Sequence, residues 1–335
     1  MLINLVVAFL GISLLLYCLF AGADFGGGML ESFLGEKRTE DQKRIIGNAI
    51  APVWEANHVW IILAIVILFN GFPNAYSEIS ILFHIPILIM LVGIILRGCA
   101  FTFRHYDAIR GRSQVYYSAI FIFSSYLAPL MLGIIAGALF LGRIPLNPTS
   151  FSDIYIFPWF NWFSLAVGVF TCALFSFLAA VYLVGETNDV ELKTIFSKKA
   201  RIGNLVAVIS GGLVFLSAEG LGLSLVQIFL KNGITMACLA AATMALFPLW
   251  ISLKKKQIWT SRMLASSQVA FILVGWFAAQ FPVIMTRGNS SLTIYNSAAP
   301  EPTLRYLLLA LISGVLLIFP ALFYLLRVFK KSALS

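Results

Sequence analysis

Long apolar segments alternate with short polar segments along the whole chain. A transmembrane helix needs about 20 predominantly apolar residues. Eight segments have roughly that length: 2–22, 78–103, 115–141, 159–185, 202–218, 232–252, 262–284 and 305–328. This pattern predicts an all-α polytopic membrane protein.

A ninth segment, 49–70, is harder to assign because polar residues precede its apolar part. Its run Val59–Phe69 is too short to cross a bilayer alone, so a crossing helix would carry Glu55, Asn57 and His58 into the hydrocarbon. Most of the 23 Lys and Arg residues gather in five regions: 37–44, 104–112, 193–201, 254–262 and 327–331. All five lie on one side only if 49–70 crosses. Because cytoplasmic loops are rich in Lys and Arg, we expect nine transmembrane helices, an extracytoplasmic N-terminus and a cytoplasmic C-terminus.

Composition agrees with this class. The chain is 60% hydrophobic and 11% charged, as expected for a membrane protein. Its net charge of +9 reflects the loop clusters, so no nucleic-acid partner is expected. Met1–Phe20 lacks a basic leading region and a cleavage site, which favours a first transmembrane helix over a removed signal peptide. The four cysteines are dispersed and have no zinc-site spacing.

A short internal similarity suggests a duplicated fold. "YCLFAGADFG" (17–26) and "YLVGETND" (182–189) both run from tyrosine through apolar residues and glycine to an acid at a helix end. We therefore predict two four-helix bundles plus one peripheral helix. The first half would be 1–145 with helices one to four, and the second 146–335 with helices five to eight and the peripheral ninth.

Few ionisable residues lie at membrane depth: Asp24, Glu55, His58, His84 and Arg97. Buried charge in a membrane is costly and often functional. Asp24, Glu55 and Arg97 fall near the cytoplasmic ends of their segments, Asp24 just past the end of the first helix. Two hypotheses follow. Asp24 and Glu55 could relay protons, or Arg97 could form a structural ion pair with one of them.

The residues near these charges argue against a metal or haem site in this chain. His58 shares a helix face with Glu55, but a di-iron site needs a second such pair and further glutamates. We place His58 and His84 in opposite halves of the membrane, so they could not ligate one haem. No metal is expected in this chain, and His58 is a hydrogen-bonded residue or a relay member. The three glycines of "ADFGGGML" (23–30) predict close helix packing or an unwound helix end.

Four motifs carry a family resemblance. They are "GADFGGGML" (22–30), "IGNAIAPVWEANHVWII" (46–62), "NGFPNAYS" (70–77) and "LRGCAFTFR" (96–104). In sequence and spacing they resemble subunit II of cytochrome bd-type quinol oxidases. The second half is similar only in hydropathy and short stretches such as "YLVGET".

The resemblance implies an enzyme complex that oxidises a quinol and reduces oxygen to water in the bacterial plasma membrane, contributing to the proton-motive force. Haem b and haem d would belong to subunit I, and this chain would be its haem-free partner without catalytic residues of its own. A small single-helix third subunit, membrane lipid and quinone are further expected partners.

The resemblance also implies residue roles. Asp24 and Glu55 match family acids, and Glu55 matches the acid linked to a proton path from the cytoplasm. Trp54 matches a tryptophan associated with bound quinone or lipid; it could equally be a packing aromatic. Thr102 stands where members often carry an acid, so a path through it would use its hydroxyl or a water. With Asp24, Glu55 and His58, it completes the predicted proton pathway.

Two other functions remain open from the sequence. A secondary transporter could use Asp24 and Glu55 as coupling acids. A purely structural scaffold for a redox partner would differ from the oxidase hypothesis only in the role of Glu55.

Overall fold

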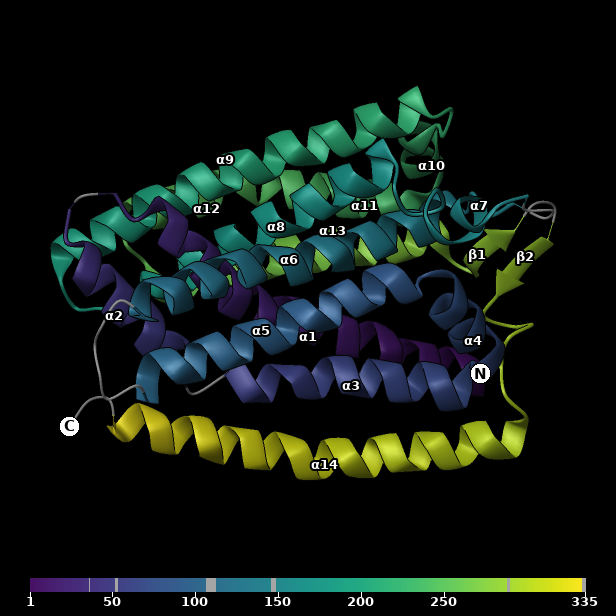
Figure 1. Ribbon diagram of the computed structural model, residues 1–335, viewed down its shortest axis with the longest axis horizontal. Helices are drawn as coiled ribbons and strands as arrows, with labels where there is room; N and C mark the ends of the chain where they lie inside the picture. Colours follow the sequence, from purple (N-terminus) through teal and green to yellow (C-terminus); the bar gives the residue numbers. More distant parts are fainter. Residues whose placement is uncertain (36, 52–53, 107–112, 146–148, 288–289, 333–335) are drawn as a thin grey trace.

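The computed structural model describes residues 1–35, 37–51, 54–106, 113–145, 149–287 and 290–332; within these, the side chains of 54–56, 105–106, 319, 322–323 and 325–332 are not described. The protein is almost entirely helical (Figure 1). Its elements are α1 (Leu2–Leu30), η1 (Glu31–Phe33), α2 (Thr39–Ile50), α3 (Trp54–Gly71), α4 (Pro73–Leu82), α5 (His84–Tyr106), α6 (Ser113–Leu141), α7 (Phe151–Tyr155), α8 (Trp162–Leu183), α9 (Val190–Gly220), α10 (Leu225–Lys231), α11 (Gly233–Met244), α12 (Leu246–Lys254), α13 (Ile258–Gln280), β1 (Val283–Arg287), β2 (Ser290–Thr293) and α14 (Glu301–Ser332).

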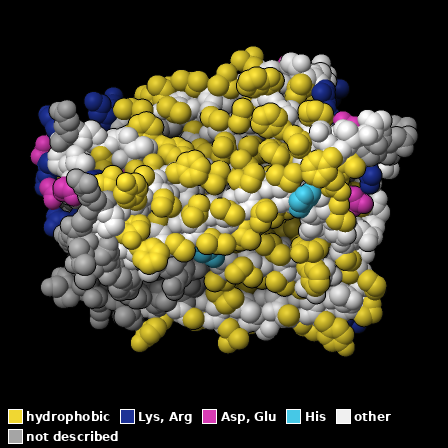
Figure 2. Space-filling view, in the orientation of Figure 1, with side chains coloured by type: hydrophobic (Ala, Val, Ile, Leu, Met, Phe, Trp, Pro, Cys, Tyr) yellow, Lys and Arg dark blue, Asp and Glu magenta, His cyan; other side chains and the backbone are white. Residues whose placement is uncertain are grey.

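The membrane character of the fold is confirmed. Within the described ranges, 8 helices or helix pairs are long and apolar enough to span a bilayer, and the count reaches 9 if α3 and α4 form one broken span. The long helices lie side by side, with α2 at one end and the β1–β2 hairpin at the other (Figure 1). In Figure 2 apolar side chains cover the middle of the visible face, while charged side chains gather at its two ends. We call these the basic end, with α2, and the hairpin end.

The disputed ninth segment forms α3, and its far end is sharply bent. α3 and α4 meet at 117°. Phe72 lies between them in a non-helical conformation, and Pro73 is the first residue of α4. A residue before proline avoids the helical region, and proline is well suited to a first helical turn. The sequence therefore places the bend at the hairpin end.

Several boundaries differ from the predicted ones. α5 begins at His84, not at 78, because α4 takes the preceding residues. α9 begins at Val190, far before 202, because Asp189 caps it by accepting from the backbone N–H groups of Glu191 and Leu192. The span predicted at 232–252 is divided into α11 and α12 near Ala245. A hydropathy pattern misses the start of a helix whose first turns are polar, as in α9.

α1 is the central helix and is continuous past its predicted end. It packs against α3, α6 and α8. A side chain at Gly26 would overlap the carbonyl of Phe175 in α8, and one at Gly28 would overlap Ser125 in α6. Gly27 faces Ile50 of α2. The close-packing prediction for these glycines is confirmed, whereas the alternative of an unwound helix end is wrong. The two-bundle division and the boundary at 145/146 stay predictions.

Candidate functional site

A buried ion pair joins α1 to α5. Arg97 donates from Nη2 to Asp24 Oδ1 at 2.5 Å and from Nη1 to Asp24 Oδ2 at 2.9 Å. The same Nη2 donates to the Asp24 backbone carbonyl at 2.9 Å. The side chains are 3% and 0% exposed respectively, so neither charge contacts solvent. Asp24 therefore lies inside α1 and not past its end as expected, because α1 continues to Leu30.

Two further helices complete the site. Asn57 of α3 donates from Nδ2 to Asp24 Oδ2 at 2.6 Å. Ser125 of α6 accepts from Arg97 Nε at 3.1 Å. The guanidinium also lies over the rings of Phe25 and Phe121, 4.7 and 5.0 Å from their centroids. The carboxylate thus has three side-chain N–H donors, and four helices meet at one buried charge pair.

A second ion pair lies nearer the basic end. Arg104 Nη1 donates to the two carboxylate oxygens of Glu31 at 3.2 and 3.0 Å. The Glu31 side chain is 2% exposed and that of Arg104 is 14% exposed. Arg104 also lies over Phe121, 4.8 Å from the ring centroid. Sequence reasoning counted Arg104 only as a loop charge and missed Glu31. The equal spacing of the two acids and the two arginines was the available signal.

The other predicted site residues are more scattered. His58 is half-buried on α3, one residue after the buried Asn57. Thr102 is exposed on α5, so it does not lie in the buried cluster. Glu55 and Trp54 begin α3, and their side chains lie outside the described part of the chain. Of the candidate residues, the structure brings together Asp24 and Arg97, and it adds Asn57, which the sequence did not single out.

The described residues do not fit a bis-histidine haem. His84 begins α5 at the hairpin end, donates from Nδ1 to the Ile81 carbonyl at 2.8 Å, and packs against Tyr155. His58 lies near the start of α3, toward the opposite end. Among the residues that the structure describes, no three His, Cys, Asp or Glu side chains gather as metal ligands.

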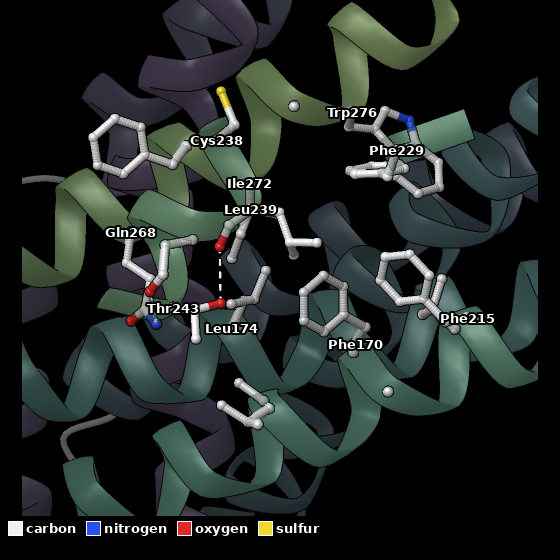
Figure 3. Close-up of a pocket in the computed structure, with 18 of the residues that line it drawn as sticks. Phe170, Leu174, Phe215, Phe229, Cys238, Leu239, Thr243, Gln268, Ile272 and Trp276 are labelled. Carbon is white, nitrogen blue, oxygen red and sulfur yellow. Dashed lines mark hydrogen bonds between the residues drawn. The ribbon is translucent and has the colours of Figure 1, made fainter. Parts of the chain in front are cut away.

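An apolar pocket of about 300 Å³ lies elsewhere, among α8, α9, α10, α11, α12 and α13. Phe170, Phe215, Phe229 and Trp276 gather at one end of it, and Gln268 and Thr243 lie at the other (Figure 3). Asn204 donates to Gln268 Oε1 at 3.1 Å, and Gln268 donates to the Ala242 carbonyl at 3.2 Å. Its lining residues include none from the two ion pairs.

Charge pairing also fixes the loops of the basic end. Arg38, just before α2, donates to Asp189 at 2.5 Å and to Asp41 at 2.9 Å. The hydrogen bond from Arg38 and those from backbone N–H groups hold the pKa of Asp189 below its ordinary range. This contact joins the first helices of the chain to the start of α9.

The sequence and fold match one family over nearly the whole chain. The pattern of cytochrome bd terminal oxidase subunit II covers residues 2–329. Cytochrome bd ubiquinol oxidase subunit 2 of Bacillus subtilis (strain 168) is 28% identical over 319 residues, which are 92% of this chain and 90% of that protein. Cytochrome bd-I ubiquinol oxidase subunit 2 of Escherichia coli (strain K12) is 30% identical over 204 residues, 59% of this chain and 52% of that protein.

A solved structure shows the same fold. A chain of the bd oxidase from Geobacillus thermodenitrificans superposes with a TM-score of 0.79, covering 98% of both chains at 21% identity. The transporter hypothesis finds no support in these similarities. The chain belongs to the cytochrome bd terminal oxidase subunit II family.

Proposed function

We propose that this chain is the haem-free subunit II of a bd-type terminal quinol oxidase in the bacterial plasma membrane. Subunit I would be its partner and would hold haem b and haem d, the groups that pass electrons from quinol to oxygen. This chain would support assembly and deliver protons, so that the complex contributes to the proton-motive force. A small single-helix third subunit and bound lipid or quinone complete the expected partners.

The proposed orientation follows the loop charges. The turn before α2, the start of α9 and the α12–α13 connection all carry basic residues and lie at the basic end. Because basic loops stay in the cytoplasm, the basic end would be cytoplasmic and the N-terminus extracytoplasmic. The protons used to make water would then enter from the basic end.

One observation carries the proton-delivery role: the buried Asp24–Arg97 pair is tied by Asn57 to the helix that also carries Glu55 and His58. Asn57 Oδ1 is buried and has no partner among the described residues. This oxygen can accept a hydrogen bond from a water or a protonated carboxylic acid beside the Asp24–Arg97 pair. Glu55 would carry the proton, and Asp24 and His58 would set the polarity of its path.

Thr102 and Trp54 have proposed roles that differ from that of Glu55. Thr102 is exposed on α5, so any part it has in the path would act at the surface that faces lipid or the partner. Trp54 directly precedes Glu55 and remains a proposed contact for quinone or lipid. Both roles can be separated from Glu55 by single substitutions.

The first experiment is purification of the tagged chain from its native membrane in mild detergent, followed by a reduced-minus-oxidised visible spectrum. A haem-rich preparation with a second polytopic chain is expected. A colourless chain without a partner, under conditions that preserve other membrane complexes, would contradict the proposed function.

The second experiment replaces Glu55. Glu55→Ala in the complex is expected to slow oxygen consumption with quinol by about 100-fold, the lower range for a lost proton-transfer group, with haem content intact. Glu219→Ala is the matched control, because Glu219 is exposed at the hairpin end. An unchanged rate in Glu55→Ala would leave the chain a structural scaffold.

A further inference from the structure

The two buried ion pairs repeat with the same spacing on both helices. Glu31 follows Asp24 by seven residues, and Arg104 follows Arg97 by seven. Seven residues of helix advance about 10 Å, nearly two turns. α1 and α5 both run from the hairpin end to the basic end. The second pair therefore repeats the first, about two turns closer to the basic end.

The two acids differ in how firmly they are held. Asp24 accepts from both terminal nitrogens of Arg97 and from Asn57, and it is fully buried. Such a set of donors holds both carboxylate oxygens in place. Glu31 accepts from the guanidinium of Arg104 at 3.0 to 3.3 Å, and Arg104 reaches the surface. Glu31 is thus the more loosely held acid, and it lies between the basic end and Asp24.

The surroundings connect the two pairs. Both arginines lie over the ring of Phe121, and Ser125, one turn further along α6, accepts from Arg97. The absence of a side chain at Gly28 lets the Ser125 hydroxyl approach α1 closely. Burial disfavours the charge of a carboxyl while a neighbouring arginine favours it, so a carboxyl under both influences can exchange a proton. The cations that act on Glu31 are Arg104, Arg97 and Lys43.

We propose that Glu31 is the proton-uptake carboxylate at the basic end of the path that leads past Asp24 to Glu55. Glu31 accepts a proton from water at the basic end and releases it toward Glu55, regaining its paired state with Arg104. Each proton taken up is passed on, so Glu31 is unchanged after a turnover. This inference rests on the proposed function of the chain in proton delivery.

The test uses the complete oxidase complex purified with its partner. Glu31→Gln keeps the size of the side chain but removes its titratable proton. We expect oxygen consumption at saturating quinol to fall about tenfold, less than for a direct proton-transfer group because water can partly replace an uptake site. Haem spectrum and subunit content should be unchanged. Glu31→Asp should restore most of the rate, and the solvent deuterium isotope effect should rise in Glu31→Gln.

Glu186→Gln is the matched control. Glu186 pairs with Arg262 at 2.7 Å, also at the basic end. Arg262 is 13% exposed, close to the value for Arg104, whereas Glu186 is 36% exposed and Glu31 is 2% exposed. This pair joins the α8–α9 connection to α13 and lies off the proposed path. Its loss should leave the rate of oxygen consumption and the isotope effect unchanged.

The outcomes separate the two proposals. A normal rate in Glu31→Gln together with a slow Glu55→Ala overturns the role of Glu31 and leaves proton delivery through Glu55 in place. Normal rates in both variants overturn both. Loss of haem or of the partner in Glu31→Gln and Glu31→Asp alike would make the pair a structural clamp and overturn the uptake role. A Glu31→Asp variant as slow as Glu31→Gln would also overturn the uptake role.

Discussion

Asp24 and Arg97 form a two-point ion pair, with nitrogen–oxygen distances of 2.5 and 2.9 Å, at a depth where both side chains are almost inaccessible to solvent. The pair connects two residues that are 73 positions apart in sequence. Removing one partner from a buried pair leaves an uncompensated charge, which costs more than the pair itself contributes. The pair therefore constrains the whole first part of the chain.

The first prediction concerns this pair. Asp24→Ala should destabilise the complex by about 3–5 kcal/mol, because Arg97 would stay buried without its anion. The double variant Asp24→Leu with Arg97→Leu should recover part of that loss. Thermal unfolding of the purified complex measures both effects. Equal stability of Asp24→Ala and the unchanged protein would contradict the structural importance of the pair.

The second prediction concerns the contact between Gly28 and Ser125. Gly28→Ala should destabilise the protein by about 1–3 kcal/mol, since the added methyl group would overlap the Ser125 side chain. Adding Ser125→Gly should relieve the overlap and recover part of the loss. Gly212→Ala is the control, because a methyl group there meets no neighbour within 4 Å. The unfolding temperatures of the three variants measure these effects. If Gly28→Ala and Gly212→Ala lose the same stability, the overlap with Ser125 is not the cause of the loss.

The third prediction concerns pH. Hydrogen bonds from Arg38 and backbone N–H groups lower the pKa of Asp189 in the folded chain. The stabilisation is complete above the ordinary pKa of 3.8 and is lost as the pH falls through the folded-state value. Asp189→Asn should therefore be less stable near neutral pH and should lose less stability on acidification.

The measurement for Asp189 is the unfolding temperature as a function of pH, with Glu191→Gln as control. Glu191 is 60% exposed and lies 3.6 Å from Arg38, so its contribution is small. If acidification affects the Asp189→Asn variant and the unchanged protein by the same amount, other groups govern the acid response.

The fourth prediction concerns the polar end of the apolar pocket. Gln268→Ala should cost about 1–3 kcal/mol, because the amide of Asn204 and the carbonyl of Ala242 lose a buried partner. Thr243→Val should cost much less, since the Thr243 hydroxyl donates back to the Leu239 carbonyl in its own helix. Thermal unfolding distinguishes the two variants; equal costs would show that the Gln268 bonds contribute little.

The sequence alone determined the class of fold and the residues worth examining. Apolar length identified eight spans, and loop charge identified the ninth, because a bilayer demands long apolar helices and sorts basic loops to one side. Rarity of charge at membrane depth singled out Asp24 and Arg97. These are local properties of composition, which need no knowledge of how the helices pack.

Only the tertiary structure decided which groups meet. Sequence reasoning left Arg97 free to pair with Glu55 or Asp24, and the packing of α6 against both α1 and α5 places it on Asp24. Sequence reasoning missed Glu31, because a polar residue at a helix end looks like a loop residue in any sequence. The continuation of α1 and the parallel course of α5 bury it beside Arg104. Contacts between residues some 70 positions apart depend on how helices are arranged, which hydropathy does not encode.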